Sequence, residues 1–332
     1  MPDVAMWRKA LTVMPHISKQ EWEGLDWLSR WLVASRSAVL VMTFTSAAFA
    51  GVLALKAGAL DPLLWLLVTV GLCLAHATNN LLNDLTDHWK GVDRDNYFRT
   101  QYGPQTVEAG FLSPGGLLLY AALTGLLALA IGAYLVWLRG ETALLLLGAG
   151  AFFVLFYTWP LKYIGLGEPA VLLVWGPLMV GGSYFVITGQ GSGDVAVASL
   201  AYALGPTAVL FAKHIDKLEA DREKGIRTLP VLLGERLSRS VIPGLLVGQF
   251  AVIAYGIGTG YFTPAMALTL LAAPGLGRVF AVTSKPRPDE PPPELPEAVW
   301  PLWFVAVTFA YNRRFGAWFL LALVVDVALS RL

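Results

Sequence analysis

Residues 62–95 read PLLWLLVTVGLCLAHATNNLLNDLTDHWKGVDRD, an apolar stretch that becomes polar and acidic in its second half. A bilayer core about 30 Å thick needs about 20 apolar residues per helical crossing. The stretch is long enough for one crossing, and its charges gather at one end. It therefore predicts a transmembrane helix over residues 62–86 that leads into a charged loop.

The whole chain has the composition of a membrane protein. Of its 332 residues 56% are hydrophobic and only 14% are charged, and the mean hydropathy is +0.60; soluble domains carry about 25% charge. Apolar runs predict an all-α, polytopic membrane protein with about nine transmembrane helices. The predicted spans are 31–56, 62–86, 114–138, 142–159, 168–189, 195–215, 240–259, 262–282 and 299–329.

The two ends of the chain depart from this simple pattern. Residues 1–30 are too polar for a signal peptide, which needs an apolar region of about 7–15 residues. We expect them to form an amphipathic arm on the membrane surface, followed by a single transmembrane domain over 31–332. Arg313 and Arg314 interrupt the last apolar run, which predicts either two half-helices or one short span after an interfacial segment.

The charges predict the orientation of the chain. The formal net charge of +1 does not favour a nucleic-acid partner. With the predicted spans, 18 of the 24 Lys and Arg residues lie on one side of the membrane, and only Lys56 and Arg139 lie on the other. Because Lys and Arg accumulate in cytoplasmic loops, we expect a multi-pass protein of a bacterial cell membrane with its N-terminus and both acidic loops in the cytoplasm.

Eight of the 23 acidic residues fall in two segments, 79–95 and 216–228, each at the predicted cytoplasmic end of a span. Asn80, Asp84 and Asp87 are spaced i, i+4 and i+7, so that a helix presents all three on one face. Carboxylate oxygens suit Mg²⁺, which commonly binds one or two carboxylates together with substrate phosphates. The pattern predicts a site for a diphosphate whose hydrocarbon tail enters the bilayer. The alternative is a pair of solvated charged loops, but polar groups inside an apolar run are usually functional.

Four motifs carry a resemblance to a known family. Residues 80–93, NLLNDLTDHWKGVD, resemble the motif N-x-x-N-D-x-x-D-x-x-K-G-x-D of the UbiA superfamily of intramembrane prenyltransferases, in its 1,4-dihydroxy-2-naphthoate branch. Three further segments are similar to motifs of the same branch: 102–114, 156–168 and 221–234.

The resemblance implies a central cleft in which Mg²⁺ draws off diphosphate and an electron-rich aromatic acceptor attacks the allylic cation. It implies catalytic roles for Asp84, Asp87, Lys162 and Tyr157, the last with its ring facing the cation. The implied substrate-binding residues are Asn80, Asn83, Arg36, Lys90, Arg94, Lys224 and Arg227. The implied metal ligands are Asp84, Asp87, Asp221 and Asp216.

The second motif departs from the family pattern. The family commonly has an Asp four residues before the position of Asp221, where this chain has Lys217, with Asp216 one place earlier. A helix turns about 100° per residue, so on a regular helix Asp216 and Asp221 point apart. Either Glu219 takes the vacant role, or the helix breaks, or Lys217 neutralises diphosphate as a point charge. We expect Asp221 to matter more than Asp216.

The sequence thus predicts Mg²⁺-dependent transfer of a prenyl group from a prenyl diphosphate to an aromatic quinone precursor within membrane lipid. A dihydroxynaphthoate, the acceptor of menaquinone biosynthesis, is favoured. One alternative on the same scaffold is terpene cyclisation or prenylation of a lipid alcohol, which needs no aromatic acceptor. A non-enzymatic lipid-binding protein or a transporter is a further alternative, but transport requires no paired Asp loops on one face.

Overall fold

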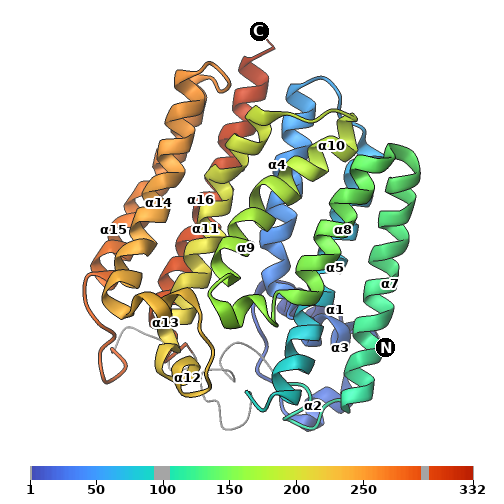
Figure 1. Ribbon diagram of the computed structural model, residues 1–332, viewed down its shortest axis with the longest axis vertical. Coiled ribbons are helices and arrows are strands. Elements are labelled where there is room, and N and C mark those ends of the chain that lie inside the picture. Colours follow the sequence, from blue (N-terminus) through green and yellow to red (C-terminus); the bar gives the residue numbers. More distant parts are fainter. Residues whose placement is uncertain (1, 93–104, 293–298, 332) are drawn as a thin grey trace.

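The computed structural model describes residues 2–92, 105–292 and 299–331, and this part of the chain is helical without a strand. Figure 1 shows long helices running side by side along the long axis, with short helices gathered at one end. The N-terminal elements are α1 (Val4–Thr12), α2 (Lys19–Gly24), α3 (Trp27–Ala34) and η1 (Ser37–Val39). The elements that follow are α4 (Leu40–Lys56), α5 (Pro62–Trp89), α7 (Pro114–Arg139), α8 (Glu141–Phe156), η2 (Leu161–Ile164), α9 (Gly167–Leu173), η3 (Val174–Gly181), α10 (Gly182–Thr188), α11 (Gly193–Asp216), α12 (Leu218–Glu223), α13 (Leu229–Leu233), α14 (Glu235–Gly258), η4 (Pro264–Ala272), α15 (Ala273–Thr283) and α16 (Trp303–Leu329).

The predicted all-α membrane class is confirmed, but the count of nine spans is not. In the described residues, seven helices are long and apolar enough to cross a membrane. The predicted span 142–159 corresponds to α8, which is apolar but has only 16 residues. The last region forms one continuous helix of 27 residues, α16, which matches neither the two half-helices nor the short span after an interfacial segment that the sequence predicted. Arg313 and Arg314 do not interrupt it because backbone hydrogen bonding in a helix is independent of side-chain charge.

Local sequence signals set the starts of α5, which carries the first motif, and of α7, which packs against α5. The Asp61 carboxylate accepts the backbone N–H groups of Leu63 and Leu64 at 2.9 and 3.0 Å, and Pro62 occupies the first turn of α5. At α7, the Ser113 hydroxyl accepts the N–H of Gly116 at 3.1 Å. Such caps satisfy donors that the first helical turn leaves unpaired.

The predicted span 168–189 is a broken helix. Its middle, η3, has wide turns, and Gly176 departs from helical geometry with φ −101° and ψ −106° next to Pro177. The Ser46 hydroxyl donates to the carbonyl oxygen of Trp175 at 3.1 Å and so satisfies one group freed by the break. A Cβ atom at Gly176 would lie only 2.9 Å from Cβ of Ala203, which requires glycine there. The break bends this helix around an internal cavity.

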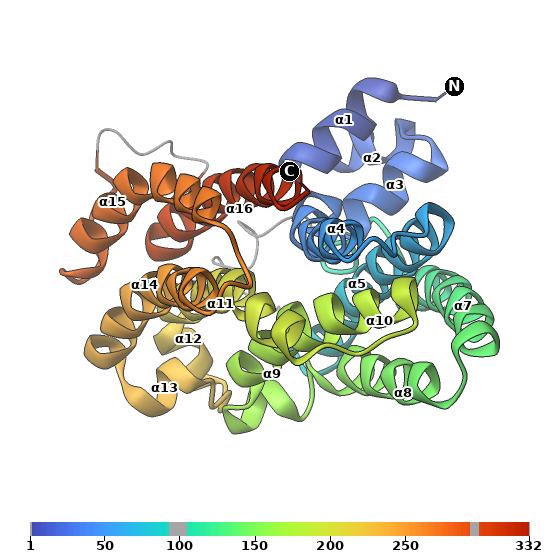
Figure 2. The same cartoon turned by 90° about the horizontal axis from the view of Figure 1, so that it is seen from above.

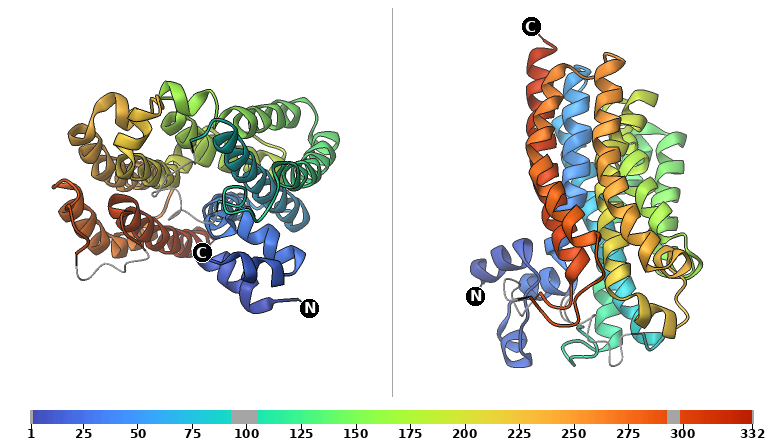
Figure 3. Two further views of the ribbon diagram at one scale, coloured as in Figure 1. Left: turned by 90° about the horizontal axis from the view of Figure 1, so that it is seen from below. Right: turned by 90° about the vertical axis from the view of Figure 1, so that its left-hand side faces the viewer.

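Seen from above, the long helices surround the centre of the molecule, and α1, α2 and α3 project from the side next to α4 (Figure 2). Figure 3 shows these three helices at the same end of the bundle as the short helices that follow α11. These helices pack against the body, since the ring of Trp22 stacks on Phe111 at 5.1 Å and the indole of Trp31 donates to Thr124 at 2.8 Å. The main core lies elsewhere, where Phe49, Phe315 and Phe319 are fully buried.

Candidate active site

The first part of the site joins the start of the transmembrane body to α5. Arg36 has a left-handed backbone (φ 55°), unlike any other non-glycine residue that the structure describes. Its guanidinium donates to the Asp84 carboxylate at 3.0 Å and to the carbonyl oxygen of Asn80 at 3.1 Å. The Asn80 amide in turn donates to the Ser35 carbonyl at 2.9 Å. Backbone outliers of this kind concentrate at functional sites, and here the strained residue presents its cation to a motif carboxylate.

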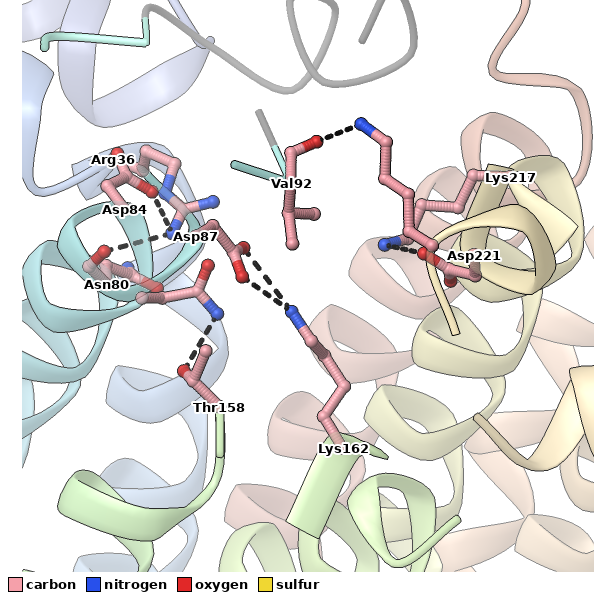
Figure 4. A network of polar contacts seen from close by, with 11 residues as sticks. Arg36, Asn80, Asp84, Asp87, Val92, Thr158, Lys162, Lys217 and Asp221 are labelled. Atoms are coloured by element: carbon pink, nitrogen blue, oxygen red, sulfur yellow. Dashed lines mark hydrogen bonds and ion pairs between the residues drawn. The ribbon is translucent and has the colours of Figure 1, made fainter. Parts of the chain in front are cut away.

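The second part pairs the other motif carboxylate with a lysine. Nζ of Lys162, on η2, lies 3.1 and 3.3 Å from the two oxygens of Asp87, and both side chains are buried. One turn earlier on α5, the Asn83 amide donates to the Thr158 hydroxyl at 3.0 Å. Figure 4 shows Lys162 reaching up to Asp87 from the segment that also carries Thr158. Two adjacent turns of α5 therefore bind to the short segment 158–162. These contacts fix the position of Lys162 relative to the Asp87 carboxylate.

The second motif faces the first across a narrow space (Figure 4). The helix breaks at Lys217 (φ −117°, ψ 24°), which was one of the predicted alternatives. The Lys217 ammonium donates to Oδ1 of Asp221 at 2.9 Å, and the buried Oδ2 of Asp221 accepts no hydrogen bond from the described part of the chain. The Lys224 ammonium donates to the carbonyl oxygen of Val92, directly after the first motif. The two motifs thus form a single site at one end of the bundle.

Asp216 lies outside this constellation, contrary to its predicted role as a metal ligand. Its two oxygens accept the backbone N–H groups of residues 303–305 at 3.2, 3.0 and 2.9 Å, so it caps the start of α16. Glu219, the predicted substitute, is exposed and paired with Arg222 at 2.7 Å. Neither carboxylate is directed at the site, which leaves Asp221 as the carboxylate of the second motif.

Replacing Asp216 with alanine is therefore expected to destabilise the protein more than it slows catalysis. Loss of a helix cap costs about 1–2 kcal/mol, so the unfolding temperature should fall by several degrees while turnover stays within about tenfold. Thermal unfolding and turnover of Asp216→Ala are measured together, with Asp216→Asn as the variant that keeps one oxygen acceptor. An unchanged unfolding temperature combined with abolished turnover would instead place Asp216 in the site.

The other three predicted cations, Lys90, Arg94 and Arg227, are not part of the contacts described above. Lys90 is exposed and lies over the rings of Trp159 and Tyr163, with its Nζ 5.0 and 5.3 Å from their centres. Arg227 is exposed on the loop before α13. Arg94 lies outside the described residues, as do the first three residues of the segment 102–114.

A buried Glu–His pair supports the site and was not predicted. The Glu168 carboxylate lies 2.6 Å from Nδ1 of His214, and its other oxygen accepts the backbone N–H of Leu229 at 3.4 Å. The pair joins the start of α9 to the end of α11, just before the second motif, and to the start of α13, just after it. Each residue stands out in the sequence, because Glu168 ends a family-like segment and His214 interrupts an apolar run. The pairing itself was not predictable, because the two residues are 46 positions apart in the chain.

A cavity of about 1020 Å³ opens from the polar site into the bundle. Its polar end is lined by four predicted site residues, Arg36, Asn80, Asn83 and Tyr157. The cavity thus brings together residues that are far apart in the chain. The rest of the wall is mostly apolar and includes Met42, Leu72, Leu129, Phe153 and Met179. Its volume is at the upper end of about 300–1,000 Å³ for small-molecule sites. The cavity therefore suits a long hydrocarbon chain with an anionic head.

The carboxylate oxygens of the site are suitable ligands for a hard divalent cation. Asp84, Asp87 and Asp221 supply carboxylates, and one oxygen of Asp221 is buried with no described hydrogen-bond donor. Among the described residues no three His, Cys, Asp or Glu side chains converge into a complete metal cage. This arrangement fits Mg²⁺, which is usually bound through one or two carboxylates plus substrate phosphates rather than by protein alone.

Comparisons with known proteins agree with these features. The model of the UbiA prenyltransferase family matches residues 44–295. The chain is 30% identical over 247 residues to UbiA prenyltransferase domain-containing protein 1 of Danio rerio, covering 74% of this chain and 72% of that protein. It is also 30% identical over 234 residues to the 1,4-dihydroxy-2-naphthoate octaprenyltransferase of Escherichia coli K12, covering 68% and 75%. Its relatives thus include vertebrate and bacterial proteins.

Solved structures share the fold. A UbiA homolog from Archaeoglobus fulgidus bound to GPP and Mg²⁺ matches with a TM-score of 0.60 at 17% identity, covering 89% of this chain and 99% of that chain. The apo UbiA homolog from Aeropyrum pernix K1 matches with a TM-score of 0.64 at 19% identity, covering 86% and 97%. The arrangement of helices around the cavity is therefore that of a known membrane fold.

Proposed function

The chain belongs to the UbiA prenyltransferase family and is a membrane prenyltransferase, and from this premise we propose that it transfers a prenyl group to an aromatic, carboxylate-bearing quinone precursor. A dihydroxynaphthoate is the favoured acceptor, and its product would be a precursor of a menaquinone-type lipid. The E. coli relative, named for a dihydroxynaphthoate substrate, supports this acceptor class. The donor would be a prenyl diphosphate.

The observation that carries the proposal is the charged mouth of the apolar cavity. Two carboxylates of one helix face are each held by a cation, Asp84 by Arg36 at 3.0 Å and Asp87 by Lys162 at 3.1 Å. Asp84, Asp87 and Asp221 would hold Mg²⁺, which when bound offsets the negative charge that develops on the leaving diphosphate. A diphosphate at this mouth would direct its chain into the apolar cavity.

The chain's own residues supply the rest of the chemistry. Lys162, Lys217 and Lys224 would hold the diphosphate oxygens as the bond between C1 of the prenyl group and oxygen breaks and its electron pair leaves with diphosphate. The ring of Tyr157, at the polar end of the cavity, would face the allylic cation, a contact worth up to about 2 kcal/mol when dry. A ring carbon of the acceptor then supplies the electron pair for the new C–C bond and afterwards loses its proton. The apolar walls exclude water, which would otherwise capture the cation.

We further propose that the site opens to the cytoplasm. The predicted spans assign 18 of the 24 Lys and Arg residues to this side, and such residues accumulate in cytoplasmic loops. Figure 1 shows α12, α13 and the C-terminal end of α5 at the same end of the bundle as the N-terminal arm. A water-soluble diphosphate group would then approach from the cytoplasm, and the lipid product would remain in the membrane.

The proposal predicts that prenylated product forms only when donor, aromatic acceptor and divalent cation are all present. Purified protein in lipid nanodiscs is incubated with farnesyl or geranylgeranyl diphosphate and with 1,4-dihydroxy-2-naphthoate, 4-hydroxybenzoate or no acceptor. Product is identified by mass spectrometry, and diphosphate release is followed in parallel. Chelation should stop both signals and Mg²⁺ should restore them. Hydrocarbon and diphosphate formed without any acceptor would favour terpene cyclisation instead.

A further inference from the structure

An arginine in the middle of α16 has no assigned role. Arg313 is the eleventh residue of this 27-residue helix, at a depth where an arginine is expensive unless it faces water or an anion. It forms no hydrogen bond or ion pair with the described residues, and its guanidinium lies 6.0 Å from the ring centre of Phe309. Arg313 lines the cavity described above, whereas the adjacent Arg314 does not.

The depth of Arg313 relative to the site follows from the cap of α16. Asp216 holds the start of that helix at the second motif. Ten residues of helix rise about 15 Å. Helical side chains lean toward the N-terminus, and the contact with Phe309, one turn earlier, shows this direction. The guanidinium therefore lies about 10 Å deeper than the start of α16, which leaves room for an aromatic ring between it and the diphosphate end.

The cavity wall carries positive charge and no described carboxylate, which favours an anion beside Arg313. The described lining includes the cations Arg36, Lys213 and Arg313, and no Asp or Glu side chain. Arg36 serves the mouth, where it pairs with Asp84. The side formed by α7 and α8 is apolar, with Leu126, Leu147 and similar residues, and suits the hydrocarbon chain. Lys213 lies in the last turn of α11, three residues before Asp216 and so near the second motif. Of the cations in the described lining, Arg313 is therefore the one that lies deep in the cavity.

We propose that Arg313 binds the carboxylate of the aromatic acceptor and so selects a carboxylated acceptor over a neutral hydroquinone. The inference rests on the proposed function and adds a specificity-determining residue to it. A guanidinium binds a carboxylate through two parallel N–H···O bonds, and such a pair fixes the direction of an otherwise flat, apolar ring. With its carboxylate held at α16, the acceptor would present its ring toward the mouth, where the prenyl C1 lies.

The experiment compares Arg313→Gln with Arg314→Gln, a matched control on the same helix at the same depth. Two acceptors are used, 1,4-dihydroxy-2-naphthoate and 1,4-naphthalenediol, which lacks the carboxylate. Arg313→Gln should raise KM for the naphthoate by roughly 10- to 100-fold and leave KM for the diol and for prenyl diphosphate unchanged. Arg313→Lys should restore part of the loss, and Arg314→Gln should stay within about twofold of wild type.

Binding of an acceptor analogue is measured separately from turnover, so that the carboxylate site at Arg313 and the proposed prenyl transfer are tested independently. Affinity for 1-hydroxy-2-naphthoate, a stable analogue, is determined by calorimetry for wild type, Arg313→Gln and Arg314→Gln. If wild type prenylates neither acceptor but binds the analogue through Arg313, the proposed function fails and the carboxylate site stands. An equal rise of KM for both acceptors, or analogue binding that is absent or indifferent to Arg313, would overturn the inference.

Discussion

Asp87→Asn is expected to lower kcat by about a thousandfold or more. The carboxylate of Asp87 is buried, and both its oxygens lie within 3.3 Å of Nζ of Lys162. Asparagine keeps the shape but removes the negative charge, so the site loses a candidate metal ligand together with the group that orients the lysine. Metal ligation contributes several kcal/mol to such transition states, and each 1.36 kcal/mol is about tenfold in rate. Single-turnover release of diphosphate measures the effect.

Stability must be separated from chemistry here, because Asp87→Asn leaves the buried Lys162 without its partner. Breaking a buried pair in this way costs about 3–5 kcal/mol in soluble proteins. The double variant Asp87→Asn/Lys162→Met removes that buried charge, so it should regain thermal stability but not turnover. Asp61→Asn is the matched control, since Asp61 caps the opposite end of α5 and asparagine caps equally well. Turnover of Asp87→Asn within tenfold of wild type would remove Asp87 from the metal site.

Asp221→Asn is expected to lower kcat by about a hundredfold and to raise the Mg²⁺ concentration needed for half-maximal rate. Asp221 is 2% exposed, its Oδ1 accepts from Lys217 at 2.9 Å, and its Oδ2 has no described partner. A buried carboxylate oxygen without a donor is costly unless a ligand occupies it. We expect about 3 kcal/mol of lost transition-state stabilisation, about two factors of ten. Rates are measured across a Mg²⁺ titration.

The control for Asp221→Asn is Glu219→Gln, two residues earlier on the same short helix. Glu219 is exposed and paired with Arg222, and exposed ion pairs contribute about 0–1 kcal/mol, so its rate should stay near that of wild type. Asp216→Asn should also lose less activity than Asp221→Asn, because its carboxylate caps α16. A larger loss for Glu219→Gln or Asp216→Asn than for Asp221→Asn would show that the second motif is read in the wrong register.

The parts of the site that were predictable from sequence are those that depend on one helix. Asn80, Asp84 and Asp87 share a face of α5 because a spacing of three or four residues nearly completes a helical turn. Most of the spans were predictable for a second local reason, because a helix can cross a bilayer only if its apolar run is long enough. Arg36 could be named as a pocket candidate because an arginine inside an apolar run needs a polar partner.

The sequence by itself therefore determined the membrane class, the acidic face of α5 and the second motif around Asp221. Only the tertiary structure decided the role of Asp216, because its carboxylate is occupied by backbone groups of residues 303–305, almost ninety positions along the chain. It likewise decided that Lys162 pairs with Asp87, that Glu168 meets His214, and that α16 continues through Arg313. Helical periodicity relates residues within about two turns, whereas these pairings depend on which helices pack together, and no local spacing encodes that.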